Sequence, residues 1–599
     1  MPESQEFDPS RDGWNIRNWH DAVLTPEAFS EAFLGVNPNS VLDDAFYKSV
    51  REKILKAGNC CGMSALALAI FKYGGYMGFC SPANFYGGDL IGHMEGGKRV
   101  YAGPDDDTLR KAINALHTRQ LSANAIENYI DLINANNWND IEAAFVKVKE
   151  LLGRGDYPIL SIGNLLFANG KILEHKDAHQ VIPYKIIDYG NGHKAMYIWD
   201  SNFPYKNNPE RYDPLSDRSY VFRWGKIPGT DTTRLREFLS KKYHIDWVNN
   251  AAIVKSNDGK SINISIGNKT LSLTLNNDET KVIIEISDGR TDKFRAKEEN
   301  NELNIYEFNC LLDITGPFEW TYYGANDYNS SKSNDCSCLV IPLSSFIKKS
   351  RYPGADMIAS ELMTILIAGS DAKVNQITDD KGHKFYKTDT DMPQLQQELE
   401  LDPARRIKDI VRWPWFGANG ESNQCELYFM RSAVGRIPFL ELSVSGKESK
   451  ISHFHSGCLI EITSMSSNRS KDIVTISRAL NTVSSIEIKT LGGKREIGIK
   501  QIRTVPKDAD WRSFDIKNVS ITQNTPLKID TEGYLDAVHI SSGDKEVEFE
   551  ANIAQSFRGK VLSRSISRIS TASERTLRIA PSEWNELGKT AINIEKFKL

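Results

Sequence analysis

The chain has 599 residues, of which 40% are hydrophobic and 25% are charged, and its formal net charge is −4. This composition is ordinary for a soluble globular protein, and a chain of this length exceeds a single core, so we expect several domains. The negative net charge argues against a general nucleic-acid binder, which usually carries a basic surface. Because no run of about eighteen apolar residues occurs, the sequence predicts no membrane span.

The beginning of the chain and its cysteines indicate a cellular compartment. The first residues, MPESQEFDPSRDGW, are polar and acidic and lack the charged and apolar segments of a secretory signal peptide. We therefore expect cytoplasmic synthesis, although export by a route without a cleaved signal would leave no trace in the sequence. Eight cysteines are too few for a disulfide scaffold of this size, so reduced thiols are expected.

The first quarter of the chain has helical periodicity. Apolar residues at three- and four-residue steps predict helices over 43–56, 60–73, 106–116 and 140–152. The second of these, CCGMSALALAIFKY, is apolar on nearly every side, which predicts a buried helix. The glycine at position 74 is expected to end it as a C-cap.

Strand-like segments follow, rich in Ile, Val and Tyr, and they read DYPILSIGNLLF, AHQVIPYKIIDY and HKAMYIWD. Helices followed by an antiparallel sheet give an α+β plan. From about residue 246 alternating strands with hairpin turns predominate, which predicts sandwich-like β modules. One apolar stretch in this part, ADMIASELMTILIAG, suits either a helix or a strand.

A cysteine stands at the point where a loop meets the buried helix, in the segment Gly58-Asn59-Cys60. A thiol attacks as the thiolate, and a helix N-terminus or a nearby histidine lowers its ordinary pKa of about 8.5. Unpaired N–H groups of the first helical turn would also hold the oxyanion of a tetrahedral intermediate. The position predicts Cys60 as a nucleophile. Cys61 is the rival nucleophile, with core packing as its alternative role.

A histidine and an aspartate on two successive strands complete the constellation. His179 lies in AHQVIPYKI, and Asp200 ends MYIWD. A general base needs its tautomer fixed by an acceptor on its second nitrogen. A hairpin turn at 190–192 would bring the two side chains together, although the pattern does not set the register. His179 is the predicted base and Asp200 its orienting acid; Asn202 is the alternative orienting residue, and Asp200 would then cap a turn.

Three segments resemble papain-like cysteine peptidases. GNCCGMSALALA resembles their nucleophile helix, especially in bacterial relatives with a G-x-C-x-G-M-S start. LLGRGDYPILSIGN and AHQVIPYKIIDYGNGHKAMYIWDSNFP are similar to their G-x-P strand and to their histidine strand with its D-x-N-x-P segment. The resemblance covers residues 10–245 and implies a papain-like domain with Cys60, His179 and Asp200 as a triad. An aspartate as third member is similar to bacteriocin-processing double-glycine peptidases and some secreted effector proteases.

One position departs from that pattern. Papain-like enzymes often carry a glutamine about six residues before the cysteine as an oxyanion donor, and Ile54 stands there in this chain. Either Asn59 or a backbone amide would then take over this role, or the oxyanion hole would be weak.

We expect five regions along the chain. They are a papain-like cysteine peptidase domain over 1–245, a β-rich domain over 246–345, a mixed connecting region over 346–424, a β-sandwich-like module over 425–505 and a β-rich C-terminal module over 506–599.

Two hypotheses of function follow. The first is a thiol hydrolase without a cofactor, which forms an acyl-enzyme with a protein or peptide substrate and uses its β modules to bind a protein or glycan partner, as a bacterial effector or toxin would. The same residues would serve acyl transfer of the transglutaminase type, although the G-M-S context favours the peptidase. The second hypothesis is a papain-like scaffold that binds without turnover.

Weaker motifs lie further along. The C-x-C at 336–338 and the H-x-H-x-x-C at 453–458 do not fit the usual ligand spacing of zinc, so we predict no metal site. Trp413 and Trp415 form an aromatic cluster typical of a carbohydrate or peptide groove or, more often, of packing between domains.

Overall fold

Among the residues that the structure describes, helices are combined with antiparallel strands. This confirms a mixed fold with antiparallel sheets. The computed structural model describes residues 6–56, 58–85, 92–95, 98–101, 103–104, 106–134, 141–168, 171–190, 193–212, 221–224, 252–255, 261–266, 269–275, 281–286, 291–299, 302–305, 310–313, 320–323, 337–355, 362–369, 372–379, 384–386, 410–413, 425–431, 439–479, 483–505, 509–523, 525–571 and 575–598.

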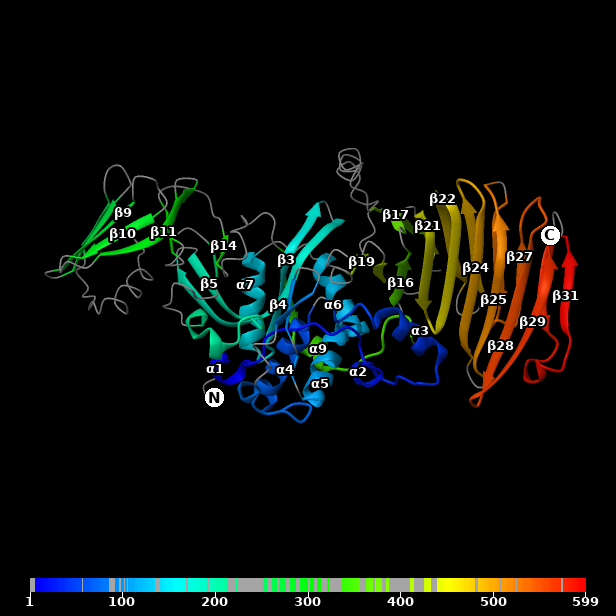
Figure 1. The fold of residues 1–599 in the computed structure, drawn as a ribbon, viewed down its shortest axis with the longest axis horizontal. Coiled ribbons are helices and arrows are strands. Elements are labelled where there is room, and N and C mark those ends of the chain that lie inside the picture. The colour runs from blue at the N-terminus through cyan, green and yellow to red at the C-terminus, as the bar shows by residue number, and fades with distance from the viewer. Residues whose placement is uncertain are drawn as a thin grey trace.

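Helices gather near the N-terminus (Figure 1). The four predicted helices appear as α3, α4, α5 and α7, and Gly74 ends α4 in the left-handed conformation, as expected of a C-cap. No described helix is long and apolar enough to cross a membrane. The helices are α1 (Pro9–Asp12), α2 (Pro26–Ala32), α3 (Val41–Val50), α4 (Cys60–Tyr73), α5 (Asp107–Thr118), α6 (Ala123–Asn134), α7 (Ile141–Gly153) and α9 (Ser344–Ile347).

A six-stranded antiparallel sheet accompanies these helices, in the order β14-β6-β5-β4-β3-β15. Its alternating apolar side chains enter two cores. Ile159 and Ile182 pack into the core that contains α4, whereas Leu160 and Val181 pack into the core that contains α7. Both faces of the sheet are therefore buried. Its strands are β3 (Pro158–Ala168), β4 (Lys171–Gly190), β5 (His193–Trp199), β6 (Val221–Trp224), β14 (Trp320–Tyr323) and β15 (Ser337–Pro342).

The two edge strands of this sheet, β14 and β15, come from the region that we expected to form a separate β-rich domain. The remaining strands of that region form a seven-stranded antiparallel meander, which lies at the end of the molecule opposite the C-terminal sheet (Figure 1). A separate hairpin joins β1 (Gly92–Glu95) to β2 (Lys98–Tyr101). The meander contains β7 (Ala252–Lys255), β8 (Ser261–Ile266), β9 (Lys269–Leu275), β10 (Lys281–Ile286), β11 (Thr291–Glu299), β12 (Glu302–Ile305) and β13 (Cys310–Asp313).

A sixteen-stranded sheet forms the C-terminal part. In the apolar stretch that suited either structure, 362–368 form strand β16, and 356–361 lie outside the described residues. The strands are β16 (Leu362–Ala368), β17 (Lys373–Asp379), β18 (Lys384–Tyr386), β19 (Ile410–Arg412), β20 (Cys425–Arg431), β21 (Phe439–His455), β22 (Cys458–Ala479), β23 (Val483–Thr490), β24 (Arg495–Val505), β25 (Ala509–Ile521), β26 (Leu527–Glu532), β27 (Ala537–Ser541), β28 (Glu548–Phe557), β29 (Lys560–Ser570), β30 (Thr576–Pro581) and β31 (Ile592–Phe597).

The long strand β22 divides this sheet into two arms. Its first half pairs with β24, which continues into β25, β28 and β29. Its second half pairs with β23, which continues into β26, β27, β30 and β31. Apolar side chains of both arms, such as Ile499 and Ile529, belong to one core. Because β24 and β25 pair with each other, this sheet extends across the expected module boundary at 505/506.

A buried ion pair stands where the arms separate. Residues 466–469 of β22 have no partner on β21, so the ladder between the two strands is interrupted there. Arg495, at the start of β24, binds Asp472 at 2.9 Å, and both side chains are at most 3% exposed. The same guanidinium donates to the carbonyl oxygens of Gly446, Lys447 and Ser470. One arginine thus connects the start of β24 to backbone carbonyl groups of both β21 and β22 at the interruption of their ladder.

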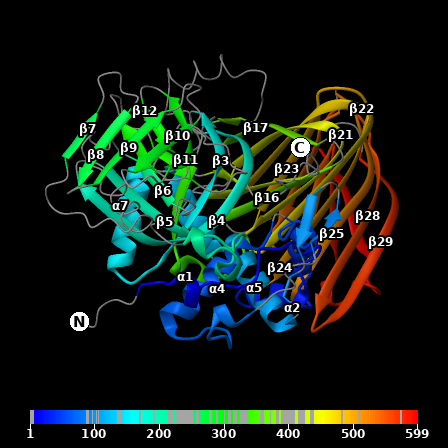
Figure 2. The same ribbon diagram turned by 60° about the vertical axis from the view of Figure 1, so that its left-hand side comes forward.

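The helical part and the C-terminal sheet share a core. Phe46 of α3 stacks on Tyr352 at 4.1 Å between ring centroids and meets Phe454 of β21 edge-on at 5.3 Å. Asp43 accepts hydrogen bonds from Tyr352 and Arg351. Figure 2 shows the helical part next to the C-terminal sheet, where α3 contacts β24. Apolar packing between the two parts favours a rigid connection rather than a flexible linker.

Candidate active site

The predicted nucleophile begins helix α4. The N–H of Met63 donates to the carbonyl oxygen of Asn59 at 3.0 Å, which starts the helix with Cys60 in its first turn. Gly62 allows α4 to approach α5 closely, because a Cβ there would lie 2.1 Å from the carbonyl oxygen of Ile113. Gly62 is therefore required for close packing, and the end of α4 that carries the thiol is held against α5.

His179 and Asp200 are brought together by the hairpin of β4 and β5. The two strands pair with Ile182 opposite Trp199, which sets the register that the sequence left open. The Nε2 atom of His179 lies 2.6 Å from an Oδ1 atom of Asp200, and the two residues are 6% and 1% exposed. The predicted base and its orienting acid are thus a buried, charge-assisted hydrogen-bonded pair.

Asp200 and the Cys60 thiol both act on the pKa of His179. Burial lowers the pKa of His179, but the charge and hydrogen bond of Asp200, with a smaller contribution from a hydrogen bond to Cys60, raise it to about 10. The imidazole is therefore charged at neutral pH. With Nε2 on the carboxylate, Nδ1 is the atom that remains for the Cys60 thiol.

The two adjacent cysteines differ in environment. Cys60 is 8% exposed, whereas Cys61 is completely buried in the helical core. Burial, together with the nearby Cys60, raises the pKa of the Cys61 thiol well above its ordinary value, which keeps it protonated. Among the cysteines that the structure describes, Cys60, Cys61, Cys80, Cys425 and Cys458 are free thiols.

The loop after β5 fixes the carboxylate. The N–H of Asn202 donates to Oδ1 of Asp200 at 2.7 Å. Its side-chain amide lies 3.3 Å from Nε2 of His179, farther than the carboxylate. The hydroxyl of Tyr212 donates to the carbonyl oxygen of Asp200 at 3.1 Å. Asp200 therefore makes the closer contact with the ring, and Asn202 contacts both members of the pair.

The residue expected to assist the oxyanion, Asn59, is completely buried. Its Nδ2 donates to the carbonyl oxygen of Trp19 at 3.3 Å. Its backbone N–H donates to Oδ1 of Asn18 at 2.7 Å. Asn18 is a residue of the site that the sequence did not reveal, because it lies 41 residues before Asn59 and no local motif connects the two. Ile54 is buried beneath the site, in the same core as α4.

The weaker sequence motifs lie elsewhere. The rings of His453 and His455 stack at 6.1 Å, and within the described ranges no group of three or more His, Cys, Asp or Glu residues could hold a metal ion. Trp413 is buried and packs edge-on against Tyr129 of α6 at 4.9 Å. This tryptophan therefore packs between the helices and the C-terminal sheet, whereas Trp415 and Cys336 lie outside the described residues.

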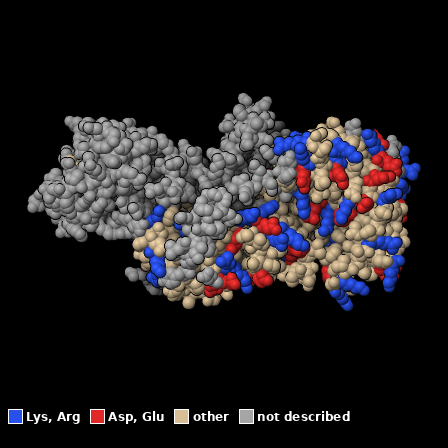
Figure 3. All heavy atoms as spheres, viewed as in Figure 1, with Lys and Arg blue, Asp and Glu red and all other residues tan. Residues whose placement is uncertain are grey.

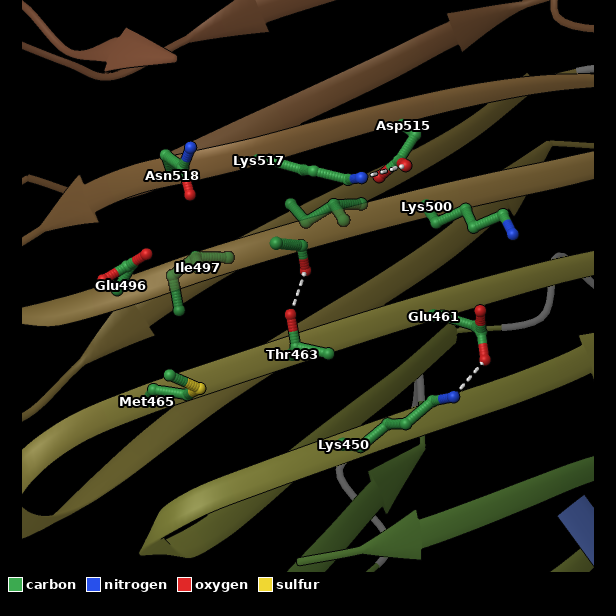
Figure 4. Close-up of a pocket in the computed structure, with 12 residues that line it drawn as sticks. Lys450, Glu461, Thr463, Met465, Glu496, Ile497, Lys500, Asp515, Lys517 and Asn518 are labelled. Carbon is green, nitrogen blue, oxygen red and sulfur yellow. Dashed lines mark hydrogen bonds and ion pairs between the residues drawn. The ribbon is translucent and has the colours of Figure 1, made fainter. Parts of the chain in front are cut away.

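A groove of about 350 Å³ lies on the outer face of β22, β24 and β25, where the Thr463 side chain lies against Gly498 (Figure 4). Lys450 and Glu461 pair at 2.6 Å, and Lys517 and Asp515 pair at 3.3 Å along its rim. Acidic and basic side chains are interspersed over the visible face of this sheet (Figure 3). The groove contains none of the residues around Cys60.

With this geometry in place, the chain was compared with protein-family models, curated proteins and solved structures, and none of them matches. The chemistry of the site is therefore inferred from its own residues.

Proposed function

We propose that the protein is a papain-like thiol hydrolase, a cysteine peptidase or a related acyl-transfer enzyme. The observation that carries the proposal is the buried hydrogen bond of His179 with Asp200, with Cys60 in the first turn of α4 acting on the pKa of the same imidazole. A histidine and a helix N-terminus are the two features that activate cysteine nucleophiles in enzymes. Cys60 would be the nucleophile, His179 the base and Asp200 the residue that orients it.

In the proposed reaction, the sulfur of Cys60 attacks an acyl carbon of a protein or peptide substrate. The carbonyl electrons move to oxygen, and the tetrahedral intermediate then expels its leaving group, which takes a proton from His179. Water, an amine or another acceptor releases the acyl group. In this proposal 1–245 is the catalytic domain, with β14 and β15 completing its sheet, and the C-terminal sheet, as one or two sandwich-like modules, binds a protein or glycan partner.

The experiment is limited iodoacetamide labelling of the native protein between pH 5 and 9, with mass spectrometry to locate the adduct. We expect rapid labelling of Cys60 below pH 7, slower labelling in His179→Ala and none at this position in Cys60→Ala. Cys61→Ala is the matched control and should label as the wild type does. Labelling no faster than that of a free cysteine in solution would reject the activated thiolate.

The low exposure of Cys60, 8%, favours a second candidate, a binding scaffold of the same fold without turnover. In that case the sulfur would be shielded from reagents of every size. The two candidates differ in one measurement: a scaffold would label slowly at Cys60 at every pH, and His179→Ala would not change the rate.

A further inference from the structure

We propose that the side-chain amide of Asn18 donates a hydrogen bond to the oxyanion formed when Cys60 attacks an acyl carbon. This inference rests on the proposed function, since it assigns a further catalytic residue to that reaction. Asn18 precedes α2 in the N-terminal segment, and it reaches the site through two contacts with different parts of the chain.

The first contact fixes the orientation of the amide. The backbone N–H of Asn59 lies 2.7 Å from one end of the Asn18 side chain, and an N–H can donate only to an oxygen, so this end is Oδ1. The other end is therefore the NH₂ group. Nδ2 lies next to Gly58, where an added Cβ would come within 2.9 Å of it.

The second contact ties Asn18 to the acid of the site. The backbone N–H of Asn18 donates at 2.9 Å to the carbonyl oxygen of Ser201, which follows Asp200. Asn18 thus bridges the loop before the nucleophile and the loop after the acid. A donor that is held between the two halves of the site is preorganised, which is the property that makes an oxyanion donor effective.

The NH₂ group of Asn18 is available for a ligand. Among the described residues Nδ2 has no hydrogen-bond acceptor, and the residue is partly exposed. Asn59, in contrast, is completely buried and its Nδ2 already donates to Trp19. Asn18 is therefore the side-chain amide at the start of α4 that can donate to a substrate, beside the N–H groups of the first turn.

Gly58 makes this arrangement feasible. Its φ of +106° lies in the region that favours glycine, and any side chain there would meet the Asn18 amide. A glycine is thus needed at position 58 for two reasons: the backbone conformation with positive φ, and the space that the amide of Asn18 occupies.

The test compares two reagents that differ in whether an oxyanion forms. Iodoacetamide alkylates the Cys60 sulfur by displacement of iodide, without an oxyanion. p-Nitrophenyl acetate is attacked at its carbonyl carbon, the electrons move to oxygen, and their return breaks the ester bond, releases p-nitrophenolate and leaves an acetyl group on the sulfur. The ratio of acylation to alkylation at one pH isolates the oxyanion step, because both rates depend on the thiolate.

Asn18→Asp retains the acceptor for the Asn59 N–H but removes the donor, and Asn18→Ala removes both. We expect the ratio to fall on the order of 10²-fold in both variants, as for other oxyanion donors. Asn39→Asp, an exposed asparagine before α3, is the matched control and should leave the ratio unchanged. Circular dichroism reports whether each variant is folded.

The outcomes are distinguishable. An unchanged ratio in Asn18→Asp would overturn the inference and leave the proposed function intact, since Asn18 would then only anchor the start of α4. If Asn18→Ala, but not Asn18→Asp, lost both alkylation and acylation of Cys60, this would likewise show that Asn18 only anchors the start of α4. Failure of both reagents to select Cys60 in the wild type would overturn the proposed function and this inference with it.

Discussion

The imidazole of His179 has a pKa of about 10 in the folded protein, compared with 6.5 for an unperturbed ring. Because the folded-state pKa is the higher one, the charged ring stabilises the fold fully below about pH 6.5. That contribution is lost as the pH rises toward about 10. We expect His179→Gln, in a Cys60→Ser background where Asp200 alone raises the pKa of the ring, to reduce the free energy of unfolding most at pH 6 and least at pH 10.

Urea unfolding of Cys60→Ser and of Cys60→Ser/His179→Gln at pH 6, 8 and 10 measures the difference in their free energies of unfolding. Asp44→Asn, which removes an exposed partner of Lys48, is a suitable comparison and should show little change with pH. A difference between the two proteins that increases with pH would mean that the ring is neutral in the folded state.

Residue types in sequence context predicted Cys60, His179 and Asp200 as the site; the structure pairs His179 with Asp200, and Cys60 acts on the pKa of the same ring. Each lies next to a local signal, such as a helix start or a strand end. Asn18 carries no such signal, because its contacts with Asn59 and Ser201 exist only after distant segments pack together. Local patterns reveal residues whose role depends on their own element, and they miss those whose role depends on tertiary packing.

Among the elements, β22 depends on the ion pair of Arg495 and Asp472 at the point where its partners change. We expect Arg495→Met to lower the free energy of unfolding by about 3–5 kcal/mol, because it leaves a buried carboxylate and three backbone carbonyl groups without their donor. Urea unfolding followed by circular dichroism measures the loss. Lys48→Met, at an exposed pair on α3, should change it by less than about 0.5 kcal/mol.

A loss of similar size in both variants would contradict a special role for the buried pair. The double variant Arg495→Met/Asp472→Ala adds a further comparison. Removal of both charges leaves no unpaired carboxylate, so we expect it to be more stable than Arg495→Met alone.

The sequence predicted single elements better than their pairing. An apolar run bounded by glycines was enough to place α4, and alternation was enough to place the strands of the C-terminal part. Alternation is the same in both halves of β22, however, so it could not show that each half pairs with a different strand. The arms separate at 466–469, where the ladder with β21 is interrupted and where Arg495 binds beside it.

At the scale of the whole molecule, the helical part and the C-terminal sheet are expected to unfold together, because their cores are continuous through Phe454. Phe454 is 1% exposed and contacts the rings of Phe46 and Tyr352. We expect Phe454→Ala to destabilise the protein by about 3–5 kcal/mol, through lost apolar contacts and a cavity. Urea unfolding should be followed by circular dichroism for the sheet and by alkylation of Cys61 for the helices.

The two probes should shift to lower urea together in this variant. Phe557→Ala, at an exposed position on β28, is the control and should leave both transitions within about 0.5 kcal/mol of the wild type. Separate transitions for the two probes would show that the parts unfold independently in spite of the shared core.

Strand β15, which completes the sheet behind the site, is synthesised after all three site residues. Cys60, His179 and Asp200 are all translated well before 337–342, yet this strand pairs with β3, where Ile162 lies between Cys338 on one side and His179 on the other. A growing chain therefore carries the reactive residues before it can close the sheet that positions them. We expect a fragment ending just before Ser337 to alkylate at Cys60 much more slowly than the full chain; equal rates would show that β15 is dispensable. The order of synthesis would thus delay thiol reactivity until most of the protein has been made.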